Sequence, residues 1–225
     1  MYLLIPAAGS GKRMGADRNK LLLEVHSQPL LAWTLLAAEA ASSISWIGIV
    51  SQPTDWDDFK AIIANLNLKK TIEFIIGGST RQESVYNGLQ ALPKEANHVL
   101  IHDGARCLIT PDLFNKCAES ILHCSGLIAG VPVKDTIKIV DDQGMIQDTP
   151  NRAFLWAAQT PQGFDVKLLK KCHDQGLRQG WEVTDDAALF EKCGLEVKII
   201  PGEETNLKIT TPQDLAIAEF IIKNR

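Results

Sequence analysis

The amino-acid sequence predicts an α/β protein in which a mostly parallel sheet is sandwiched by helices. Two observations lead to this fold class. Short apolar segments, typical of strands covered on both faces, recur along the chain. Longer segments of helical character lie between them, and this alternation favours parallel strands connected by helices. The length of 225 residues is consistent with a single domain, so we treat residues 1–225 as one unit.

The segments predicted to be strands are short and mostly apolar. They are Tyr2–Pro6, Trp46–Val50, Glu73–Ile76, His98–His102 and Leu127–Val131. The helices expected between or after them are Leu30–Ser42, Asp55–Asn65, Arg81–Leu92, Pro111–Cys124 and Val166–Gln175. Two later helices have start signals, because Thr184-Asp185-Asp186 provides a cap with two acids and Thr211-Pro212 places proline in the first turn.

Residues 134–152 interrupt this alternation and are predicted to form a protruding β-hairpin arm. Polar and apolar residues alternate over Thr136–Val140, Asp141–Gly144 suits a turn, and Met145–Gln147 resumes an extended run. An isolated two-stranded ribbon is only marginally stable in water. We therefore expect the arm to pair with the same arm of a second copy in a two-fold homodimer. A hairpin folded back on its own sheet is the alternative.

Composition and charge narrow the classes of function. The formal net charge of −4 gives no support for nucleic-acid binding, which is usually accompanied by a strongly basic face. Apolar stretches are too short to span a membrane, and Tyr2–Pro6 lacks the features of a signal peptide. The five cysteines form no CxxC pair and are expected to be reduced thiols. We therefore expect a cytoplasmic protein with neither nucleic acid nor membrane as partner.

The segment from Pro6 to Gly15, with the sequence PAAGSGKRMG, follows the first strand and suits a phosphate-binding loop. Small residues let backbone N–H groups approach a polyphosphate, and Lys12 and Arg13 add positive charge. A Walker loop is excluded because Pro6 and Arg13 replace its first glycine and its Ser/Thr. A dinucleotide fingerprint would require glycine at Met14. An ordinary glycine-rich turn between strand and helix is the alternative.

Ordered motifs along nearly the whole chain carry a resemblance to a known family. They are Ala7-Ala8-Gly9, Gly11, Arg13-Met14 and Lys20; Gly77-Gly78, Arg81-Gln82 and Ser84-Val85; His102–Arg106; Pro132-Val133 and Asp135-Thr136; Arg152, Leu155-Trp156 and Gln159–Gln162; Thr184-Asp185; and Lys208–Thr210, Pro212 and Asp214-Leu215. Together these motifs resemble the 2-C-methyl-D-erythritol 4-phosphate cytidylyltransferase family of the non-mevalonate isoprenoid pathway. The resemblance implies a Rossmann-like nucleotidyltransferase fold, and an arm that is exchanged between subunits.

The activity that the resemblance implies is transfer of CMP from CTP to 2-C-methyl-D-erythritol 4-phosphate, with release of pyrophosphate. The nucleotide-binding residues that it implies are Ala7, Ala8, Gly9, Gly11, Gly77, Ser84 and Gly104. Catalytic roles fall to Arg13, Lys20, Arg152 and Lys208, with Arg13 and Lys20 stabilising the transition state. Asp103, Arg106 and Thr136 are the implied substrate-binding residues, and Arg152 is expected to reach the site of the neighbouring subunit.

The chemistry of several side chains agrees with these roles. Arg13 can hold two phosphate oxygens at once, whereas Lys20 provides a compact charge. Gly77 and Ser84 suit recognition of a cytosine edge. Asp103 ends a predicted strand, and a carboxylate beside a triphosphate requires a cation, for which Mg²⁺ is suited. We expect His102 and Arg81 to be structural residues.

Two departures from the family pattern affect loop shape. The family commonly has Pro-Lys-Gln where this chain has Asn19-Lys20-Leu21, and it often has proline at the position of Cys107. The competing interpretations are a sister enzyme such as a ribitol 5-phosphate cytidylyltransferase, an NAD-dependent oxidoreductase, and a non-catalytic nucleotide-binding module. The missing glycine at Met14 argues against the oxidoreductase.

Overall fold

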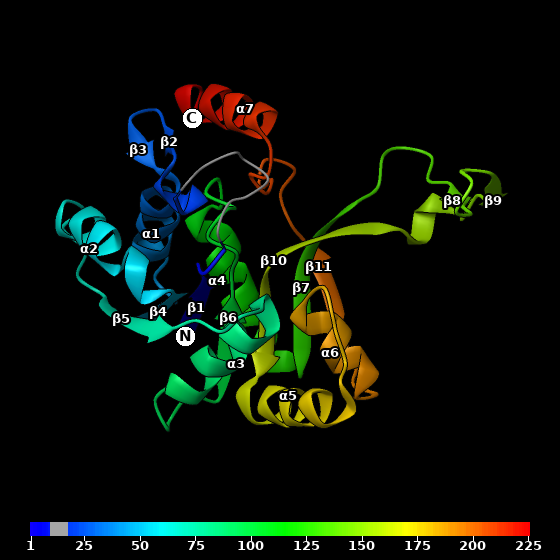
Figure 1. Cartoon of the computed structure of the whole chain (residues 1–225), viewed down its shortest axis with the longest axis horizontal. Coiled ribbons are helices and arrows are strands. Elements are labelled where there is room, and N and C mark those ends of the chain that lie inside the picture. Colours follow the sequence, from blue (N-terminus) through cyan, green and yellow to red (C-terminus); the bar gives the residue numbers. More distant parts are fainter. Residues whose placement is uncertain (10–17) are drawn as a thin grey trace.

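A computed structural model of the chain describes residues 1–9 and 18–225. Within that part of the chain, the central sheet has seven strands in the order β11-β7-β10-β6-β1-β4-β5. The strand pairs β1–β4, β1–β6, β4–β5 and β7–β11 are parallel, and β10 runs antiparallel to both of its neighbours. The predicted fold class, a mostly parallel sheet between helices, is confirmed (Figure 1). Gly11 and Arg13 lie outside the described residues.

The strands of the central sheet are β1 (Tyr2–Pro6), β4 (Trp46–Ser51), β5 (Thr71–Ile76), β6 (His98–Ile101), β7 (Gly126–Pro132), β10 (Trp156–Asp165) and β11 (Lys198–Pro201). Two short hairpins are formed by β2 (Glu24–Val25) with β3 (Gln28–Pro29) and by β8 (Ile139–Val140) with β9 (Ile146–Asp148). Five of the sheet strands coincide with the predicted ones to within two residues at either end. β10 and β11 are additions that the apolar pattern did not predict.

The α-helices are α1 (Leu30–Ala40), α2 (Trp56–Ala64), α3 (Arg81–Ala91), α4 (Pro111–Ser120), α5 (Val166–Gln179), α6 (Asp186–Lys192) and α7 (Pro212–Lys223). Short 3-10 turns are η2 (Lys20–Leu22), η3 (Pro53–Asp55), η4 (Ile121–His123) and η5 (Arg152–Phe154). The predicted cap of α7 is confirmed, because Thr211 with Asp214 forms a capping box. At α6 the N-cap is Asp185, one residue after the predicted Thr184, and its side chain accepts the backbone N–H of Ala188. Helix α5 is longer than predicted, because it ends only at Gly180, whose φ is +64°.

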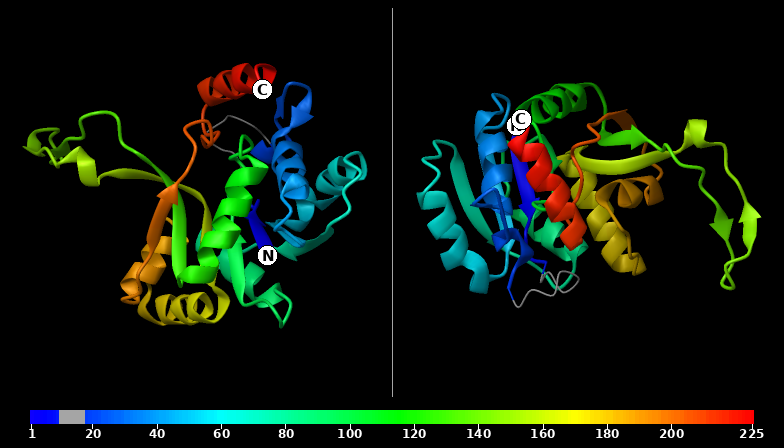
Figure 2. Two further views of the ribbon diagram at one scale, coloured as in Figure 1. Left: turned by 180° about the vertical axis from the view of Figure 1, so that it is seen from behind. Right: turned by 90° about the horizontal axis from the view of Figure 1, so that it is seen from above.

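The core is divided by the sheet into two apolar clusters, one on each face. Leu3 and Ile5 of β1 point to the cluster that includes α1, α2 and α4, whereas Leu4 points to the cluster that includes α3, α5 and α6. This division follows from the two-residue period of a strand. Figure 2 shows the two helical layers on opposite faces of the sheet. In the described part of the chain, no helix is long and apolar enough to span a membrane.

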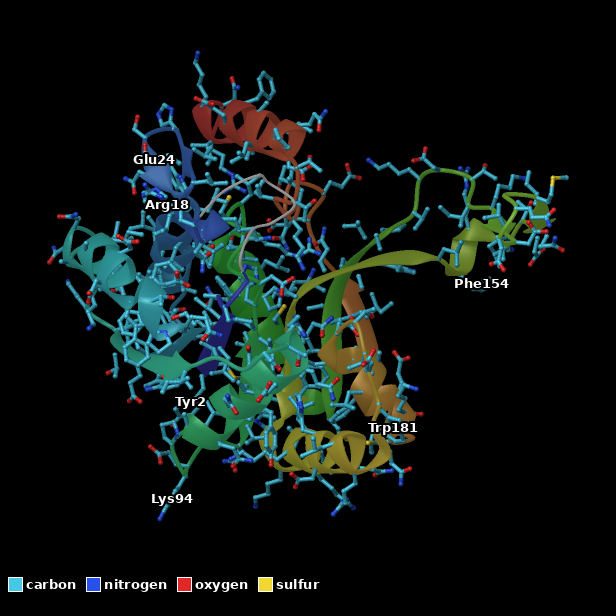
Figure 3. All side chains as sticks on the ribbon, in the orientation of Figure 1. Tyr2, Arg18, Glu24, Lys94, Phe154 and Trp181 are labelled. Carbon is cyan, nitrogen blue, oxygen red and sulfur yellow. The ribbon has the colours of Figure 1, made fainter. Side chains whose placement is uncertain are left out.

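The segment between β7 and β10 forms the predicted protruding arm. Every residue from Lys134 to Thr149 is exposed, and the β8–β9 ribbon extends away from the sheet (Figures 1 and 2). The prediction that this segment is a hairpin arm is confirmed, and the alternative in which it folds back on its own sheet is wrong. Phe154 at the base of the arm points into solvent with 82% of its surface exposed (Figure 3). Pairing with a second subunit stays a prediction.

Candidate active site

A cavity of about 370 Å³ lies at the carboxyl ends of β1, β5 and β6. Ligands of α/β proteins bind at this edge of the sheet. The cavity is lined by most of the predicted nucleotide-binding residues within the described segments, together with three of the charged residues: Ala7, Ala8, Gly9, Ser84 and Gly104, with Lys20, Asp103 and Lys208. Residues that are more than 200 positions apart in the sequence are therefore brought together as the sequence predicts.

The end of β1 and the loop after β5 approach each other closely, and Gly77 makes this approach possible. A Cβ atom at Gly77 would lie 2.8 Å from the Cβ atom of Ala8, too close for two carbon atoms. The Gly77 backbone N–H also donates to the carbonyl of Ser51 on β4. Gly77 therefore shapes the wall behind Ala8, whereas its neighbour Gly78 lines the cavity.

The hydroxyl of Ser84 is held in one orientation by its neighbours. Ser84 Oγ donates to the carbonyl of Thr80 at 2.8 Å and accepts from the backbone N–H of Gly78 at 3.0 Å. Since a hydroxyl has one proton and two lone pairs, one lone pair is left for a ligand. Ser84 therefore offers the cavity a hydrogen-bond acceptor, and its donor is already in use.

Asp103 lies directly after β6 and is held by two cations from distant segments. Its Oδ1 lies 3.4 Å from Nε of Arg81, at the start of α3, and its Oδ2 lies 2.7 Å from Nζ of Lys208. Burial alone would raise the pKa of the Asp103 carboxyl, but Arg81 and then Lys208 lower this pKa well below its ordinary value. Asp103 is therefore a carboxylate at any pH near neutrality.

Arg81 connects this carboxylate to a second one deeper in the protein. Its Nη1 donates to Oδ2 of Asp186 at 2.8 Å, and Asp186 also lies 3.6 Å from Nε2 of the buried His173. Burial alone would lower the pKa of Arg81, but Asp186 and Asp103 raise it above its ordinary value. Sequence reasoning assigned Asp186 to the positive end of α6, whereas its side chain is turned inward. It missed this role because nothing in the local sequence distinguishes Asp186 from the capping Asp185.

A second cavity, of about 180 Å³, adjoins the first and shares Arg81, Asp103 and Lys208 with it. Arg106 lines it and donates to the carbonyls of Asn206 at 2.7 Å and Ala158 at 3.2 Å. The remaining lining residues come mainly from β10 and from the loop before α6: Ala158, Gln159, Thr160, Gln162, Thr184 and Asp185. The two cavities thus meet at Asp103 and Lys208.

The two predicted site residues of the arm lie away from both cavities. Thr136 and Arg152 are exposed residues of the arm, and neither lines the cavities formed by the described residues of this chain. Arg152 Nη1 donates to the carbonyl of Lys134, across the base of the arm. In this structure neither residue is placed to contact a ligand in either cavity.

His102 is a packed residue, as expected. It is fully buried against the ring of Phe114, and its Nδ1 accepts from the Thr160 hydroxyl while its Nε2 donates to the carbonyl of Arg106. The Thr160 hydroxyl oxygen in turn accepts the backbone N–H of Asp103. Burial lowers the pKa of the His102 imidazole to about 4, so the ring is neutral and holds the backbone on either side of Asp103.

The residues present fit a Mg²⁺ ion of the kind that is shared with a nucleotide. Asp103 is the one carboxylate among the described residues that line the larger cavity. In the same part of the chain, no group of three or more His, Cys, Asp or Glu side chains is placed to hold a metal ion. Magnesium commonly takes one or two carboxylates, and phosphate oxygens and waters supply its other ligands. A single carboxylate at the wall of a cavity of about 370 Å³ is consistent with this pattern.

The fold and the site together define an α/β protein with two adjoining cavities at the carboxyl edge of its sheet. A sequence model of the 2-C-methyl-D-erythritol 4-phosphate cytidylyltransferase family matches residues 1–224. The protein with that name from Nostoc punctiforme is 78% identical over 225 residues, which are 100% of this chain and 99% of the relative. The relative from Crocosphaera subtropica is 68% identical over the same 225 residues, again 100% of this chain and 99% of the relative.

Solved structures give the same result. The 4-diphosphocytidyl-2C-methyl-D-erythritol synthase of Anaerococcus prevotii is 34% identical and has a TM-score of 0.88, with 99% of this chain and 97% of that chain covered. The 2-C-methyl-D-erythritol 4-phosphate cytidylyltransferase of Thermus thermophilus is 31% identical with a TM-score of 0.77, covering 99% and 98% of the two chains. The chain belongs to the 2-C-methyl-D-erythritol 4-phosphate cytidylyltransferase family and is a cytidylyltransferase.

The buried neutral state of His102 predicts a loss of stability in mild acid. The unfolded chain takes up a proton at this histidine near pH 6.5, whereas the folded protein does so only near pH 4. Acidification between these values therefore favours the unfolded state, by about 3 kcal/mol in total. We expect the free energy of unfolding, measured by urea denaturation, to fall more steeply from pH 6.5 to 4 for the wild type than for His102→Asn. Parallel curves for the two proteins would contradict this assignment.

Proposed function

We propose that this chain transfers CMP from CTP to 2-C-methyl-D-erythritol 4-phosphate, giving 4-diphosphocytidyl-2-C-methyl-D-erythritol and pyrophosphate for isoprenoid precursor synthesis. The observation that carries the assignment of the sites is that the two cavities meet at Asp103 and Lys208. CTP occupies the larger cavity, and the polyol phosphate occupies the smaller one. The attacking phosphate and the α-phosphate of CTP then meet next to the ammonium group of Lys208.

The reaction needs positive charge more than it needs a general base. A phosphate oxygen of the polyol substrate attacks the α-phosphorus of CTP, the new P–O bond forms, and the bond to the β-phosphate oxygen breaks with that oxygen keeping the electron pair. Both reactants are anions, so fixed cations lower the barrier by opposing their repulsion and by stabilising the developing charge. Lys20 and Lys208 line the larger cavity. Arg13 belongs to the phosphate-loop motif from Pro6 to Gly15.

Cytosine selection is supported by the state of the Ser84 hydroxyl. Its proton is committed to the carbonyl of Thr80, so Ser84 presents an acceptor to the cavity. The exocyclic amino group of cytosine is a donor and matches this acceptor, whereas the carbonyl oxygen at the same position of uracil is a second acceptor. With UTP, two acceptors would face each other and this polar contact would be unmatched. The site is therefore expected to prefer CTP to UTP.

Magnesium is the cofactor that the donor set suits. Asp103 would hold Mg²⁺ together with phosphate oxygens of CTP, and the ion would supply positive charge to the phosphates. In the ligand-free protein, Lys208 and Arg81 both contact the Asp103 carboxylate. The carboxylate therefore keeps its orientation and its charge before any ligand binds.

The arm supports the proposal of a homodimer in which each subunit completes the site of its partner. Large apolar side chains on the arm are exposed, including Met145 at 63% and Ile146 at 60%. Exposed apolar surface of this kind marks an interface, and an identical arm related by a two-fold axis is the simplest cover. Arg152 and Thr136, which do not line the cavities of their own subunit, would then bind the polyol phosphate in the neighbouring site.

The cellular setting that we propose is the cytoplasm, with small molecules and a second copy of the chain as partners. All five cysteines are free thiols, as is usual for proteins of a reducing compartment. The net charge of −4 gives no basis for a nucleic-acid partner. A ribitol 5-phosphate cytidylyltransferase would share the CTP site, so the choice of polyol has to be tested directly.

The proposed reaction is tested by pyrophosphate release. We expect release with CTP and 2-C-methyl-D-erythritol 4-phosphate, and much slower release when ribitol 5-phosphate replaces the polyol or when UTP replaces CTP. The expected loss of kcat/KM with UTP is roughly tenfold to a hundredfold, the cost of leaving a buried polar group unmatched. Equal rates with UTP would refute the role of Ser84, and a preference for ribitol 5-phosphate would assign the protein to the sister activity.

Asp103→Asn is expected to lower kcat about a hundredfold or more, as is common when one fixed charge is removed from a reacting site. The variant keeps the shape of the side chain but loses the charge that would hold Mg²⁺. The activity of the variant should therefore require higher Mg²⁺ than that of the wild type. The control is Asp112→Asn, which removes an exposed carboxylate on α4. Wild-type rates for Asp103→Asn at low Mg²⁺ would show that Asp103 only stabilises a turn.

The exchange of arms is tested with mixed dimers of two inactive variants. Arg152→Ala removes a residue of the arm, and Lys20→Ala removes a residue of the cavity. If Arg152 serves the neighbouring site, one of the two sites in a mixed dimer regains both residues, and about half of the sites in those dimers become active. Native mass spectrometry measures the fraction of mixed dimers. If mixed dimers form and activity does not return, Arg152 does not act in the site of its partner.

A further inference from the structure

The 3-10 turn η2 presents Lys20 to the larger cavity, and both neighbours of Lys20 in the sequence are buried. Asn19 is 4% exposed and Leu21 is 2% exposed, whereas Lys20 itself lines the cavity. Lys20 Nζ donates to the carbonyl of Ile209 at 3.2 Å, beside Lys208. A buried polar side chain next to a proposed catalytic lysine requires an explanation, because burial of an amide is costly unless its hydrogen bonds are made.

The side-chain amide of Asn19 connects three parts of the chain. Its Nδ2 donates to the carbonyl of Ala7 at 2.6 Å and to Oδ2 of Asp55 at 2.8 Å, so both donors are used. Its Oδ1 accepts the backbone N–H of Leu21 at 3.0 Å and thereby caps η2. The end of β1, the turn that carries Lys20 and the turn before α2 are thus held by one side chain.

The other neighbour of Lys20 fixes the turn by apolar packing. A Cβ atom at Gly104 would lie 2.8 Å from Cδ1 of Leu21 and 3.2 Å from Cγ2 of Ile5. Leu21 therefore occupies the space that a side chain at position 104 would need, directly after Asp103. Polar contacts on one side of Lys20 and apolar contacts on the other leave its backbone little freedom to move.

We propose that Asn19 is a positioning residue for cytidylyl transfer, which acts by holding the turn that aims Lys20 at the reacting phosphates. The inference rests on the catalytic role proposed for Lys20. Displacement of a catalytic group by about 1 Å can cost a hundredfold in rate. Loss of the Asn19 amide should therefore reduce the rate through Lys20 and leave the remainder of the CTP site in place.

A kinetic double-mutant cycle tests this coupling. Asn19→Ala is expected to lower kcat roughly tenfold to a hundredfold, while the KM for CTP changes by less than about threefold, because the other contacts to the nucleotide remain. The double variant Asn19→Ala/Lys20→Ala is expected to have the kcat of Lys20→Ala within about twofold, since Asn19 has nothing left to position. Losses that multiply in the double variant would overturn the inference and show that Asn19 acts independently of Lys20.

The matched control is Asn115→Ala. The Asn115 side chain on α4 accepts the backbone N–H of Ser43 at 3.0 Å, so the variant also breaks an asparagine contact between two segments, but it lies outside both cavities. Thermal denaturation is followed for each protein. If Asn115→Ala lowers kcat as much as Asn19→Ala does at an equal loss of stability, the effect is general and the inference fails.

An exchange of amide and carboxylate keeps the test valid if Asn19→Ala does not fold. Asn19→Asp places a carboxylate against Asp55 and should lower kcat more than tenfold. Adding Asp55→Asn supplies an amide that can donate to the new carboxylate at position 19, and part of the rate should return. No recovery in the double variant would contradict the link between residues 19 and 55.

Two outcomes separate the positioning role from the proposed function. A wild-type rate for Lys20→Ala would refute the proposed function of Lys20. A wild-type rate for Asn19→Ala with an inactive Lys20→Ala would refute the positioning role alone.

Discussion

The carboxylate of Asp103 is held between two cations, and the arrangement of the site depends on this interaction. Asp103 follows β6, Arg81 begins α3 and Lys208 lies in the C-terminal segment, so their contacts bring three distant parts of the chain together. A buried charge is costly unless it is paired. The site is therefore assembled only when all three segments are in place. Arg81 extends the interaction to Asp186 on α6 and thus connects the site to the helical layer behind it.

Neutral contacts then fix the remaining walls of the cavity. His102 and Thr160 hold the backbone of Asp103, Ser84 orders the loop after β5, and Asn19 ties the turn of Lys20 to β1. Each of these polar groups is buried, and each has its partners within the protein. Preorganised groups do not have to be reoriented during the reaction, which is the condition under which fixed charges contribute most to phosphoryl transfer.

Most strands with uninterrupted apolar runs could be predicted from the sequence, whereas β10, whose polar residues are buried, could not. The buried runs around Leu4, Ile47 and Leu100 identify strands because nothing polar interrupts them. β10 was not predicted because Gln159, Thr160 and Gln162 are polar, and they are buried only through partners elsewhere in the chain. The hydrophobic pattern does not encode those partners.

The candidate site shows the same limit. Family motifs correctly gathered Ala7, Ser84, Asp103 and Lys208 in one cavity, but Asp186 could be assigned to Arg81 only in three dimensions. Asn19 stands where the family commonly has proline. The backbone accommodates this difference, because the φ of Asn19 is −55°, within the range that proline would impose. The roles proposed for Thr136 and Arg152 depend on a second copy, and the packing of one chain does not encode such contacts.

Asp103 and Arg81 stabilise each other as a largely buried ion pair, and a double-mutant cycle in the free energy of unfolding tests this coupling most directly. Arg81→Met, Asp103→Asn and the double variant would be compared by urea denaturation at pH 7. Because Arg81→Met leaves the Asp103 carboxylate without one of its partners, we expect the double variant to be more stable than the sum of the two single losses predicts, by about 1 kcal/mol or more. Strictly additive losses would show that the two residues do not stabilise each other and that their ion pair does not hold the site together.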